Sequence, residues 1–404
     1  MQRIKLLLSG AVVVVLMLAP SVGRGSTISG WRTDGTGSYP RAQPPVEWSP
    51  KSDNIVWATA MPGWSNSTPV IIGDRLFVCS EPTTLVCVRV SDGKILWQRD
   101  NSTKQLAPPI NEPLPSAHRR NGHSSSTPVT DGEHVYAVFG NGVVACYDLD
   151  GQRRWITKAG ASSHKWGHSS SPALAGDTLA VLFEDLVGLN TKTGQVKWRA
   201  PSRQRWGSPI ATRIDQADVF ITPNGETIDA GDGRVLFQGT GSLEWCSPVV
   251  ADGVLYQIER VSSATKLPEK IGASDKPREL WVSRIKHDRY YSSPLIHNGL
   301  IYAVTRGEVL TVLDARSGAT IYERPLDLKG PKPNSAYSSV ALAGPYIYIG
   351  SQSGITLVIK PGREYREVAR NHLEPYRSTP VFVGRRMYLR GLKHLYCIES
   401  TNKR

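Results

Sequence analysis

The sequence predicts an all-β fold, a single closed eight-bladed β-propeller with four-stranded blades, whose last blade is completed by an N-terminal strand. Three observations lead to this prediction. A Ser/Thr-Pro or Ser-Val step recurs along the 404 residues at intervals of about 40 residues. Short strand patterns with glycine turns follow each step. The chain has 37 Gly and 28 Pro but only 4 Met and 6 Phe, which favours short strands joined by tight turns over a helical bundle.

The recurring step marks the start of each of eight units. A strand, a glycine-containing turn and an aromatic-rich strand follow every step, and each unit is long enough for four strands. The last residues of the eight steps are Pro69, Pro128, Pro172, Pro209, Pro248, Pro294, Val340 and Pro380.

The first unit illustrates the predicted blade. We expect its strands at residues 69–72, 75–79, 85–90 and 94–98, with a tight turn at Asp92-Gly93, where glycine supplies the positive φ that such a turn needs. Four residues after this glycine stands Trp97, and equivalent turns in later units are followed in the same way by a large side chain. These side chains are Trp97, Trp155, Trp198, Phe237 and Tyr322.

Two units depart from the regular pattern, and the departure in unit eight decides between a closed ring and a linear solenoid. In unit five, the polar stretch 262–277 replaces the third strand, and Trp281 belongs to the last strand. Unit eight stops after three strands at residues 393–399, whereas Val56 and Trp57 in segment 54–59 have the pattern of a missing fourth strand. A chain that donates its first strand to its last blade closes a ring and removes exposed sheet edges. We therefore expect residues 54–404 to form one closed propeller.

The N-terminal residues predict export. Arg3 and Lys5 precede an apolar run over residues 6–18, and small residues follow, the pattern of a secretory signal peptide over 1–25. The run is short for a membrane span, although an uncleaved anchor is an alternative, and no later stretch is apolar enough to cross a bilayer. We expect an extended leader over 26–53 and a monomeric protein in the periplasm or cell envelope, or secreted.

The charge of the chain favours solubility over nucleic-acid binding. Lys and Arg number 48 against 35 Asp and Glu, a formal net charge of +13. The basic residues are scattered without long runs, and no nucleic-acid module is present, so we expect no nucleic-acid partner.

The turn segments 92–97 and 190–198 resemble the tryptophan-docking repeat of the quinoprotein-like β-propeller superfamily. The pattern Gly30-Trp31-Arg32 also resembles the leaders of exported bacterial members. The resemblance covers residues 30–404. It implies the propeller fold, but the superfamily contains both enzymes and scaffolds.

The resemblance favours the exported, non-enzymatic branch, which includes the propeller of the outer-membrane β-barrel assembly machinery. The dehydrogenase branch binds pyrroloquinoline quinone with calcium and typically stacks an adjacent-cysteine disulfide on the quinone. This chain has no adjacent cysteine pair and is shorter. Its acidic candidates, Glu184-Asp185, Glu244 and Glu259, lie at non-equivalent places. The chain also lacks a cysteine near the cleavage region for lipid attachment.

We therefore expect a non-catalytic binding or scaffold module for proteins or peptides, with no catalytic residue, cofactor or metal. No Ser/His/Asp or Cys/His triad pattern is present, and the clustered His118, His123, His164 and His168 lack an evident third zinc ligand. Two alternatives stay open. One is a small quinoprotein oxidoreductase or sensor that binds pyrroloquinoline quinone with calcium. The other is a carbohydrate-binding propeller.

Radial repetition predicts the binding site. Residues just before each step should form a crown around the mouth of the central channel, where aromatic side chains suit a protein, peptide, small aromatic ligand or glycan. Arg119 and Arg120 could hold an anion there. The alternatives are that the aromatics wedge neighbouring blades together and that the arginines are solvated. The crown residues are Trp64, His123, His168, Trp206, Trp245, Tyr291, Tyr337 and Tyr376.

The cysteines suit packing better than redox chemistry. Cys87, Cys146 and Cys397 occupy one place in the third strand of their units, where the family pattern has Ala and a small apolar residue fits. Cys79 and Cys87 flank a short turn, and the sequence leaves open whether they form a disulfide.

Overall fold

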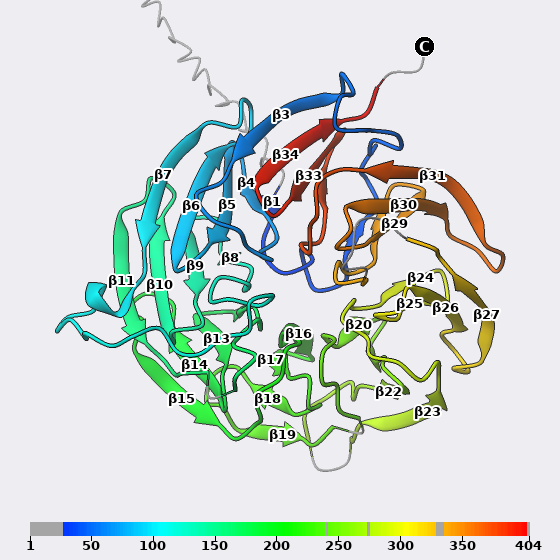
Figure 1. Cartoon of the computed structure of the whole chain (residues 1–404). Coiled ribbons are helices and arrows are strands. Elements are labelled where there is room, and N and C mark those ends of the chain that lie inside the picture. The colour runs from blue at the N-terminus through cyan, green and yellow to red at the C-terminus, as the bar shows by residue number, and fades with distance from the viewer. Residues whose placement is uncertain (1–26, 163, 240, 273–274, 329–334, 402–404) are drawn as a thin grey trace, which may run out of the picture.

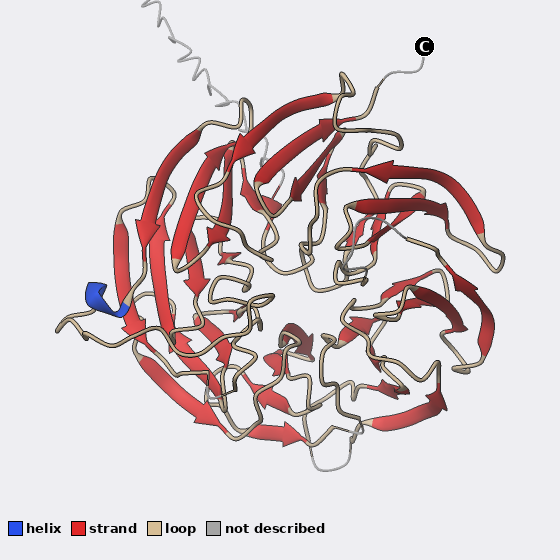
Figure 2. Cartoon of the chain, viewed as in Figure 1, coloured by secondary structure: helices blue, strands red, loops and turns tan. Residues whose placement is uncertain are grey.

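The computed structural model describes residues 27–162, 164–239, 241–272, 275–328 and 335–401. Within these residues, eight sheets are arranged as a ring around a central axis (Figure 1). Figure 2 shows that strands and loops make up almost all of the ring, and the short 3₁₀ helix η1 (Thr103–Gln105) is the single helix of the described parts. The predicted all-β, eight-bladed fold is confirmed. The predicted signal peptide, 1–25, lies outside the described residues.

In blades 1 to 4 the strand nearest the axis comes first and the outermost strand comes last (Figure 1). Blade 1 contains β4 (Val70–Ile72), β5 (Arg75–Ser80), β6 (Thr84–Arg89) and β7 (Ile95–Asp100); blade 2, β8 (Val129–Thr130), β9 (His134–Val138), β10 (Val143–Asp148) and β11 (Arg153–Lys158). Blade 3 contains β12 (Ala173–Ala175), β13 (Thr178–Leu182), β14 (Leu186–Asn190) and β15 (Val196–Ala200); blade 4, β16 (Ile210–Ile214), β17 (Ala217–Ile221), β18 (Thr227–Asp229) and β19 (Val235–Phe237).

Blades 5 to 7 repeat this order, and blade 8 takes its outer strand from the start of the propeller. Blade 5 contains β20 (Val249–Ala251), β21 (Val254–Gln257), β22 (Val261–Lys266) and β23 (Arg278–Arg284); blade 6, β24 (Leu295–His297), β25 (Leu300–Val304), β26 (Val309–Asp314) and β27 (Thr320–Pro325). Blade 7 contains β28 (Ala341–Ala343), β29 (Tyr346–Gly350), β30 (Ile355–Lys360) and β31 (Arg366–His372); blade 8, β32 (Val381–Val383), β33 (Arg386–Arg390), β34 (His394–Glu399) and β3 (Ile55–Ala60).

The ring closes as the sequence predicts. Strand β3 pairs antiparallel with β34, which places Trp57 opposite Cys397. The first and last strands of the propeller thus share one sheet, so unfolding of either end opens the ring. Apolar cores lie between neighbouring blades; in one of them Phe77 and Leu85 of blade 1 pack with Val135 and Tyr147 of blade 2.

The leader crosses the channel. Strand β1 (Thr27–Ile28) adds to inner strand β4 of blade 1, and β2 (Ser38–Tyr39) runs parallel to inner strand β28 of blade 7. Between them Arg32 is fully buried, and its Nη2 donates to the carbonyl oxygens of Pro294 (2.7 Å) and Val340 (3.0 Å). The leader therefore ties the inner strands of distant blades to one another.

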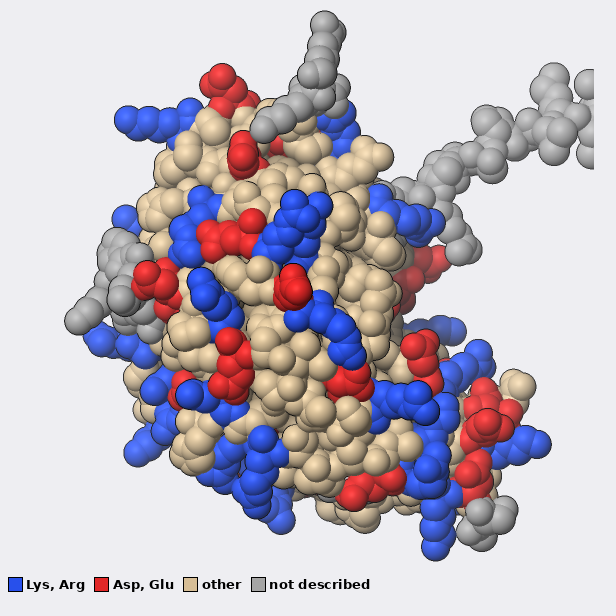
Figure 3. Space-filling view, turned by 90° about the vertical axis from the view of Figure 1, so that its right-hand side faces the viewer, with Lys and Arg blue, Asp and Glu red and all other residues tan. Residues whose placement is uncertain are grey.

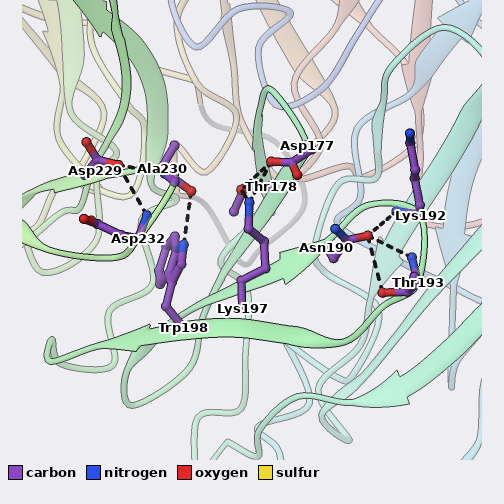
Figure 4. Close-up of polar contacts among 11 residues, drawn as sticks. Asp177, Thr178, Asn190, Lys192, Thr193, Lys197, Trp198, Asp229, Ala230 and Asp232 are labelled. Atoms are coloured by element: carbon purple, nitrogen blue, oxygen red, sulfur yellow. Dashed lines mark hydrogen bonds and ion pairs between the residues drawn. The ribbon is translucent and has the colours of Figure 1, made fainter.

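Tryptophan docking joins the outer strands of successive blades. Trp198 in β15 donates its indole N–H to the carbonyl oxygen of Ala230 in blade 4 (3.1 Å), and the turn at Asp229 and Asp232 folds against it (Figure 4). Gly233 in this turn has φ +76°, and a Cβ there would come within 2.6 Å of the Trp198 ring. The indoles of the docking residues make the same kind of bond to the next blade. These residues are Trp57, Trp97, Trp155, Trp198 and Trp281.

A second system of contacts closes a ring near the axis and explains the recurring Ser/Thr-Pro step. In each step, the residue just before the last one carries a side-chain hydroxyl. The oxygen of this hydroxyl accepts a hydrogen bond from the backbone N–H of the equivalent residue in the preceding blade. The eight bonds measure 2.8–3.1 Å and return from blade 8 to blade 1. We call these residues the hydroxyl ring: Thr68, Thr127, Ser171, Ser208, Ser247, Ser293, Ser339 and Thr379.

The prediction for blade 5 is wrong in one respect. Strand β22 (Val261–Lys266) forms a third strand within the polar stretch, paired with β21 and with β23, which carries Trp281 as predicted. Ser262 and Ser263 are buried there, and the Ser262 hydroxyl donates to the carbonyl oxygen of Glu259. Backbone pairing and these hydroxyl contacts satisfy the strand without the apolar alternation that the prediction required.

All five cysteines are buried and free. Cys79 lies opposite Leu85 and Cys87 opposite Phe77 in the β5–β6 hairpin, so the register does not place the two thiols opposite one another. Cys87 and Cys146 face the docking residues Trp97 and Trp155 across the sheet. These small side chains leave room for the indole of the adjoining strand.

The charged side chains are scattered over the surface that Figure 3 shows, as the sequence predicts. On the side of the ring in Figure 3, Lys and Arg are interspersed with Asp and Glu instead of forming one patch. None of the helical segments among the described residues has the length and hydropathy needed to span a bilayer.

Candidate ligand-binding pocket at the channel mouth

A pocket of about 340 Å³ occupies one end of the central channel and takes lining residues from every blade. In each blade the residue three positions before the end of the Ser/Thr-Pro step lines it. Hydroxyl-ring residues lie two positions further along the chain, and four of them also line the pocket: Ser171, Ser208, Ser247 and Ser293. Side chains two residues apart in an extended segment face the same side. We call the first set the mouth ring: Asn66, Ser125, Ser169, Trp206, Trp245, Tyr291, Tyr337 and Arg377.

Blades 4 to 7 give the pocket an aromatic wall made of Trp206, Trp245, Tyr291 and Tyr337. The rings of Tyr291 and Tyr337 stack with centroids 4.8 Å apart, and Trp245 meets Tyr291 edge-on at 5.9 Å. These contacts hold the side chains in fixed orientations before any ligand binds, which lowers the entropy lost on binding.

Blades 8, 1, 2 and 3 give the pocket a polar wall. Asn66 donates through Nδ2 to the Ser125 hydroxyl and to the Arg120 carbonyl oxygen, both at 2.8 Å. Arg377 donates through Nη1 to Asn66 Oδ1 at 3.2 Å. Arg377, Asn66 and Ser125 therefore form a connected hydrogen-bond network rather than a set of independent side chains.

The leader also supplies a lining residue. Trp31 lines the pocket and donates its indole N–H to the hydroxyl of Ser247, a member of the hydroxyl ring, at 3.1 Å. The leader therefore forms part of the pocket lining within the channel.

Three arginines line the pocket against a single carboxylate, that of Glu244. The Arg377 guanidinium lies 5.9 Å from the ring centroids of both Trp64 and Tyr337. Burial, together with the nearby charge of Arg120, lowers the pKa of Arg377. Arg289 lies over the Trp245 ring at 5.5 Å. The pocket is therefore aromatic and cationic.

A buried carboxylate holds the loop that carries Trp245. Glu259 is 7% exposed, and its Oε1 accepts the backbone N–H groups of Trp245 and Cys246 at 2.8 Å. Burial raises the pKa of Glu259 to about 7, and these N–H groups oppose the rise because they favour the charged form. Glu81 makes an equivalent clamp on the backbone of His123 and Ser124 in blade 2.

The structure brings together five of the residues proposed from the sequence: Arg120, Trp206, Trp245, Tyr291 and Tyr337 line the pocket. Trp64 does not line it but contacts the pocket residue Arg377. Arg119 is exposed and outside the lining.

The remaining three proposed residues lie away from the pocket. His168 is 1% exposed, stacks on Phe183 at 4.6 Å and bonds through Nε2 to the Leu182 carbonyl oxygen. Burial lowers its pKa to about 4. Tyr376 is 1% exposed and bonded to Thr356, and His123 packs beside Gly140. The wedge alternative describes His168 and Tyr376, which bond to residues of the preceding blade.

The offset from the end of the step distinguishes the four aromatic lining residues from His168 and Tyr376. Trp206, Trp245, Tyr291 and Tyr337 stand three residues before it, whereas His168 and Tyr376 stand four before it. A shift of one residue in an extended segment turns the side chain to the opposite side. Counting back three residues in every unit would have identified the missed mouth-ring members Asn66, Ser125, Ser169 and Arg377.

Other pocket residues had no repeat pattern to reveal them. Arg120 and Asn121 come from the end of the insertion between blades 1 and 2, which begins near η1 at the outer side of the ring (Figure 2). Glu112 in this insertion pairs with Lys158 of β11. His164 and Trp166 come from the loop before blade 3, and His164 meets Trp206 edge-on at 5.1 Å.

The described lining of the pocket contains a single carboxylate, that of Glu244, as a charged ligand for calcium. Among the described residues there is no group of three or more His, Cys, Asp or Glu side chains placed to hold a metal ion. Calcium needs several converging oxygen ligands. The arginines and aromatic rings could accommodate a flat acidic ring system, but the donor set does not fit a calcium–quinone pair.

A model of the family described as outer membrane protein assembly factor BamB matches residues 46–236 and again 226–404. The chain matches no curated protein significantly.

Solved structures share the fold at low identity. BamB from Moraxella catarrhalis is 13% identical with a TM-score of 0.64, over 85% of this chain and 99% of that one. The quinohemoprotein alcohol dehydrogenase from Comamonas testosteroni is 9% identical with a TM-score of 0.62, over 93% and 81%. Quinohemoprotein alcohol dehydrogenase ADHIIG from Pseudomonas putida HK5 is 11% identical with a TM-score of 0.63, over 90% and 79%. Because BamB and two alcohol dehydrogenases score alike, these similarities establish the fold and leave the activity to the residues of the site.

Proposed function

The chain belongs to the family of the outer membrane protein assembly factor BamB, and from this premise we propose that it is a non-catalytic binding module for proteins or peptides in the cell envelope. The observation that carries the proposal is the pocket itself. Residues from all eight blades and from the leader converge on one site, where an aromatic wall faces a polar, cationic one. Fixed aromatic side chains with arginines beside them are typical of protein-binding hot spots.

The proposal includes a location. The pattern of residues 1–25 supports export, and family membership supports an envelope location. We propose that the propeller acts as a monomer on the outer side of the cytoplasmic membrane. Fractionation of cells that express the full chain should recover it in the periplasmic or envelope fraction, and recovery in the cytosol would contradict this part.

Site-specific photo-crosslinking tests the binding function. A photoreactive phenylalanine at Trp206 or Tyr291 in the full chain should yield discrete crosslinked products with envelope proteins in cells. The exposed Val196 on outer strand β15 is the control position, because it lies outside the pocket. The same products from Val196, or none from either pocket position, would contradict the proposal. So would turnover of a substrate that depends on these pocket residues, or glycan binding that Trp206→Ala and Trp245→Ala abolish without any protein crosslink.

A further inference from the structure

We propose that the pocket recognises an acidic peptide segment in which a carboxylate side chain stands beside an apolar or aromatic side chain. This inference rests on the proposed function, because it names the chemistry of the partner at the same site. It begins from the positive charges in the pocket.

Arg120 and Arg377 carry charge that no carboxylate of the described residues neutralises. Neither guanidinium takes part in an ion pair there, whereas surface arginines such as Arg363 and Arg386 pair with Asp314 and Glu399. The two guanidinium groups are also close enough for Arg120 to lower the pKa of Arg377. Two like charges held together in a partly buried pocket repel one another, and an incoming anion relieves this repulsion.

Arg377 is held ready for such an anion. Its Nε donates to Gln352 Oε1 and its Nη1 to Asn66 Oδ1, each at 3.2 Å, and the rings of Trp64 and Tyr337 flank it. All of these partners are neutral, so they fix the side chain without cancelling its charge. Its Nη2 donates to no acceptor among the described residues and is left for a ligand oxygen. Charge-assisted bonds from a fixed guanidinium to a carboxylate are strong and directional.

The aromatic wall defines the second half of the ligand. Tyr337 touches both halves, since it stacks on Tyr291 and also flanks Arg377. A ligand with its anion on Arg377 therefore places its neighbouring group against Tyr291 and Trp245. Apolar or aromatic side chains gain most from such a surface.

The polar lining favours a peptide over a compact acid. Asn121, Ser125 and Ser169 border the pocket with amide and hydroxyl groups, which can bond to peptide N–H and C=O groups. The volume of about 340 Å³ suits the side chains of a short segment. The net charge of +13 adds long-range attraction for an acidic partner.

Peptide titration with the purified mature propeller tests this inference. The probe is an acetylated, amidated and fluorescently labelled pentapeptide with Glu-Phe at its centre, followed by anisotropy at low salt. We expect saturable binding that weakens about tenfold when Gln replaces the Glu, and weakens again when Ala replaces the Phe. Added salt should weaken binding of the Glu-Phe peptide more than binding of the Gln-Phe peptide.

Two variants connect the charge to the pocket. Arg377→Gln should reduce binding of the Glu-Phe peptide about tenfold while leaving the Gln-Phe peptide unchanged, so that the two losses do not add. Arg120→Gln is a second variant that disturbs the hydrogen-bond network less, because the Arg120 side chain makes no hydrogen bond among the described residues. Arg316→Gln, in the exposed β26–β27 turn, is the matched control and should bind like the wild type.

Several results would overturn the inference. These are equal affinity for the Glu and Gln peptides, no peptide binding at all, tighter binding of a phosphoserine peptide than of the Glu peptide, or binding of free glutarate and benzoate without any peptide. If crosslinks from position 206 still appear while the peptides do not bind, the proposed binding function stands and only the inferred preference for an acidic peptide is wrong. If the crosslinks fail as well, both proposals fall.

Discussion

The hydroxyl ring and the mouth ring lie two residues apart in the same repeat, yet they differ in composition. Every member of the hydroxyl ring is Ser or Thr, and each makes the same blade-to-blade bond. The mouth ring, two residues earlier, holds Trp, Tyr, Asn, Ser and Arg. The hydroxyl ring joins the blades, so its geometry requires a short side chain with an accepting oxygen. The mouth ring faces the open pocket, where side chains can differ without changing the fold. Framework and site can therefore be perturbed separately.

The largest expected effect is on the framework. Trp155→Ala should destabilise the propeller by about 3–5 kcal/mol, because Trp155 is 8% exposed, packs on Gly194 and donates to the Thr191 carbonyl oxygen. Chemical denaturation measures the change. Trp166→Ala is the matched control, since Trp166 is 39% exposed, and it should change stability by less than about 0.5 kcal/mol. Similar losses from both variants would contradict a framework carried by the docking tryptophans.

The next effect depends on pH and involves His168. Because burial lowers its pKa from 6.5 to about 4, the unfolded chain binds a proton at this residue before the folded chain does. The contribution of His168 to stability is therefore present above pH 6.5 and declines as the pH falls towards about 4. The loss is on the order of 3 kcal/mol.

Denaturation at several pH values measures this slope. His168→Gln should lower stability at pH 7 but also flatten the dependence between pH 6.5 and 4, since glutamine does not titrate. An unchanged slope in this variant would mean that His168 is accessible to protons in the folded protein, which contradicts its wedge position.

The hydroxyl ring should show a smaller effect. Ser208→Ala removes the acceptor of the buried Ser171 N–H, a bond of 2.8 Å, and should cost about 1–3 kcal/mol. Ser169→Ala in the mouth ring is the comparison, because its partly exposed hydroxyl can be replaced by water. We expect its unfolding free energy to change by under about 1 kcal/mol. Equal losses of unfolding free energy in the two variants would contradict the distinction between the hydroxyl ring and the mouth ring.

The smallest effect on stability belongs to the aromatic wall. Trp206→Ala should leave the free energy of unfolding within about 0.5 kcal/mol of wild type, yet reduce binding of the Glu-Phe peptide several-fold. Anisotropy titration and denaturation of the same preparation provide both numbers. Loss of stability with unchanged binding would assign Trp206 to the framework.

The sequence predicted the framework in detail because its determinants are local and repeated. The glycine turns, the docking residues and the closing strand around Trp57 each follow from spacing and residue type. Blade 5 was the exception, since Ser262 and Ser263 conceal a strand that backbone pairing alone supports. The site was predicted only in part. The crown residues were grouped as equivalent although their offsets differ, and a difference of one residue sends His168 and Tyr376 into the interior.

The sequence by itself determined the number of blades and the positions of the docking residues, because both depend on contacts within a repeat or between successive repeats. It also determined the closure of the ring, because segment 54–59 has the pattern of the strand that unit eight lacks. Only the tertiary structure decided which side chains meet at the channel mouth. Arg377 and Arg120 are 257 residues apart, and they become neighbours because blade 8 closes against blade 1 and the insertion before blade 2 ends beside them. Trp31 enters the pocket because the leader crosses the channel. No periodic pattern in the sequence predicts these contacts, because they arise from the geometry of the closed ring.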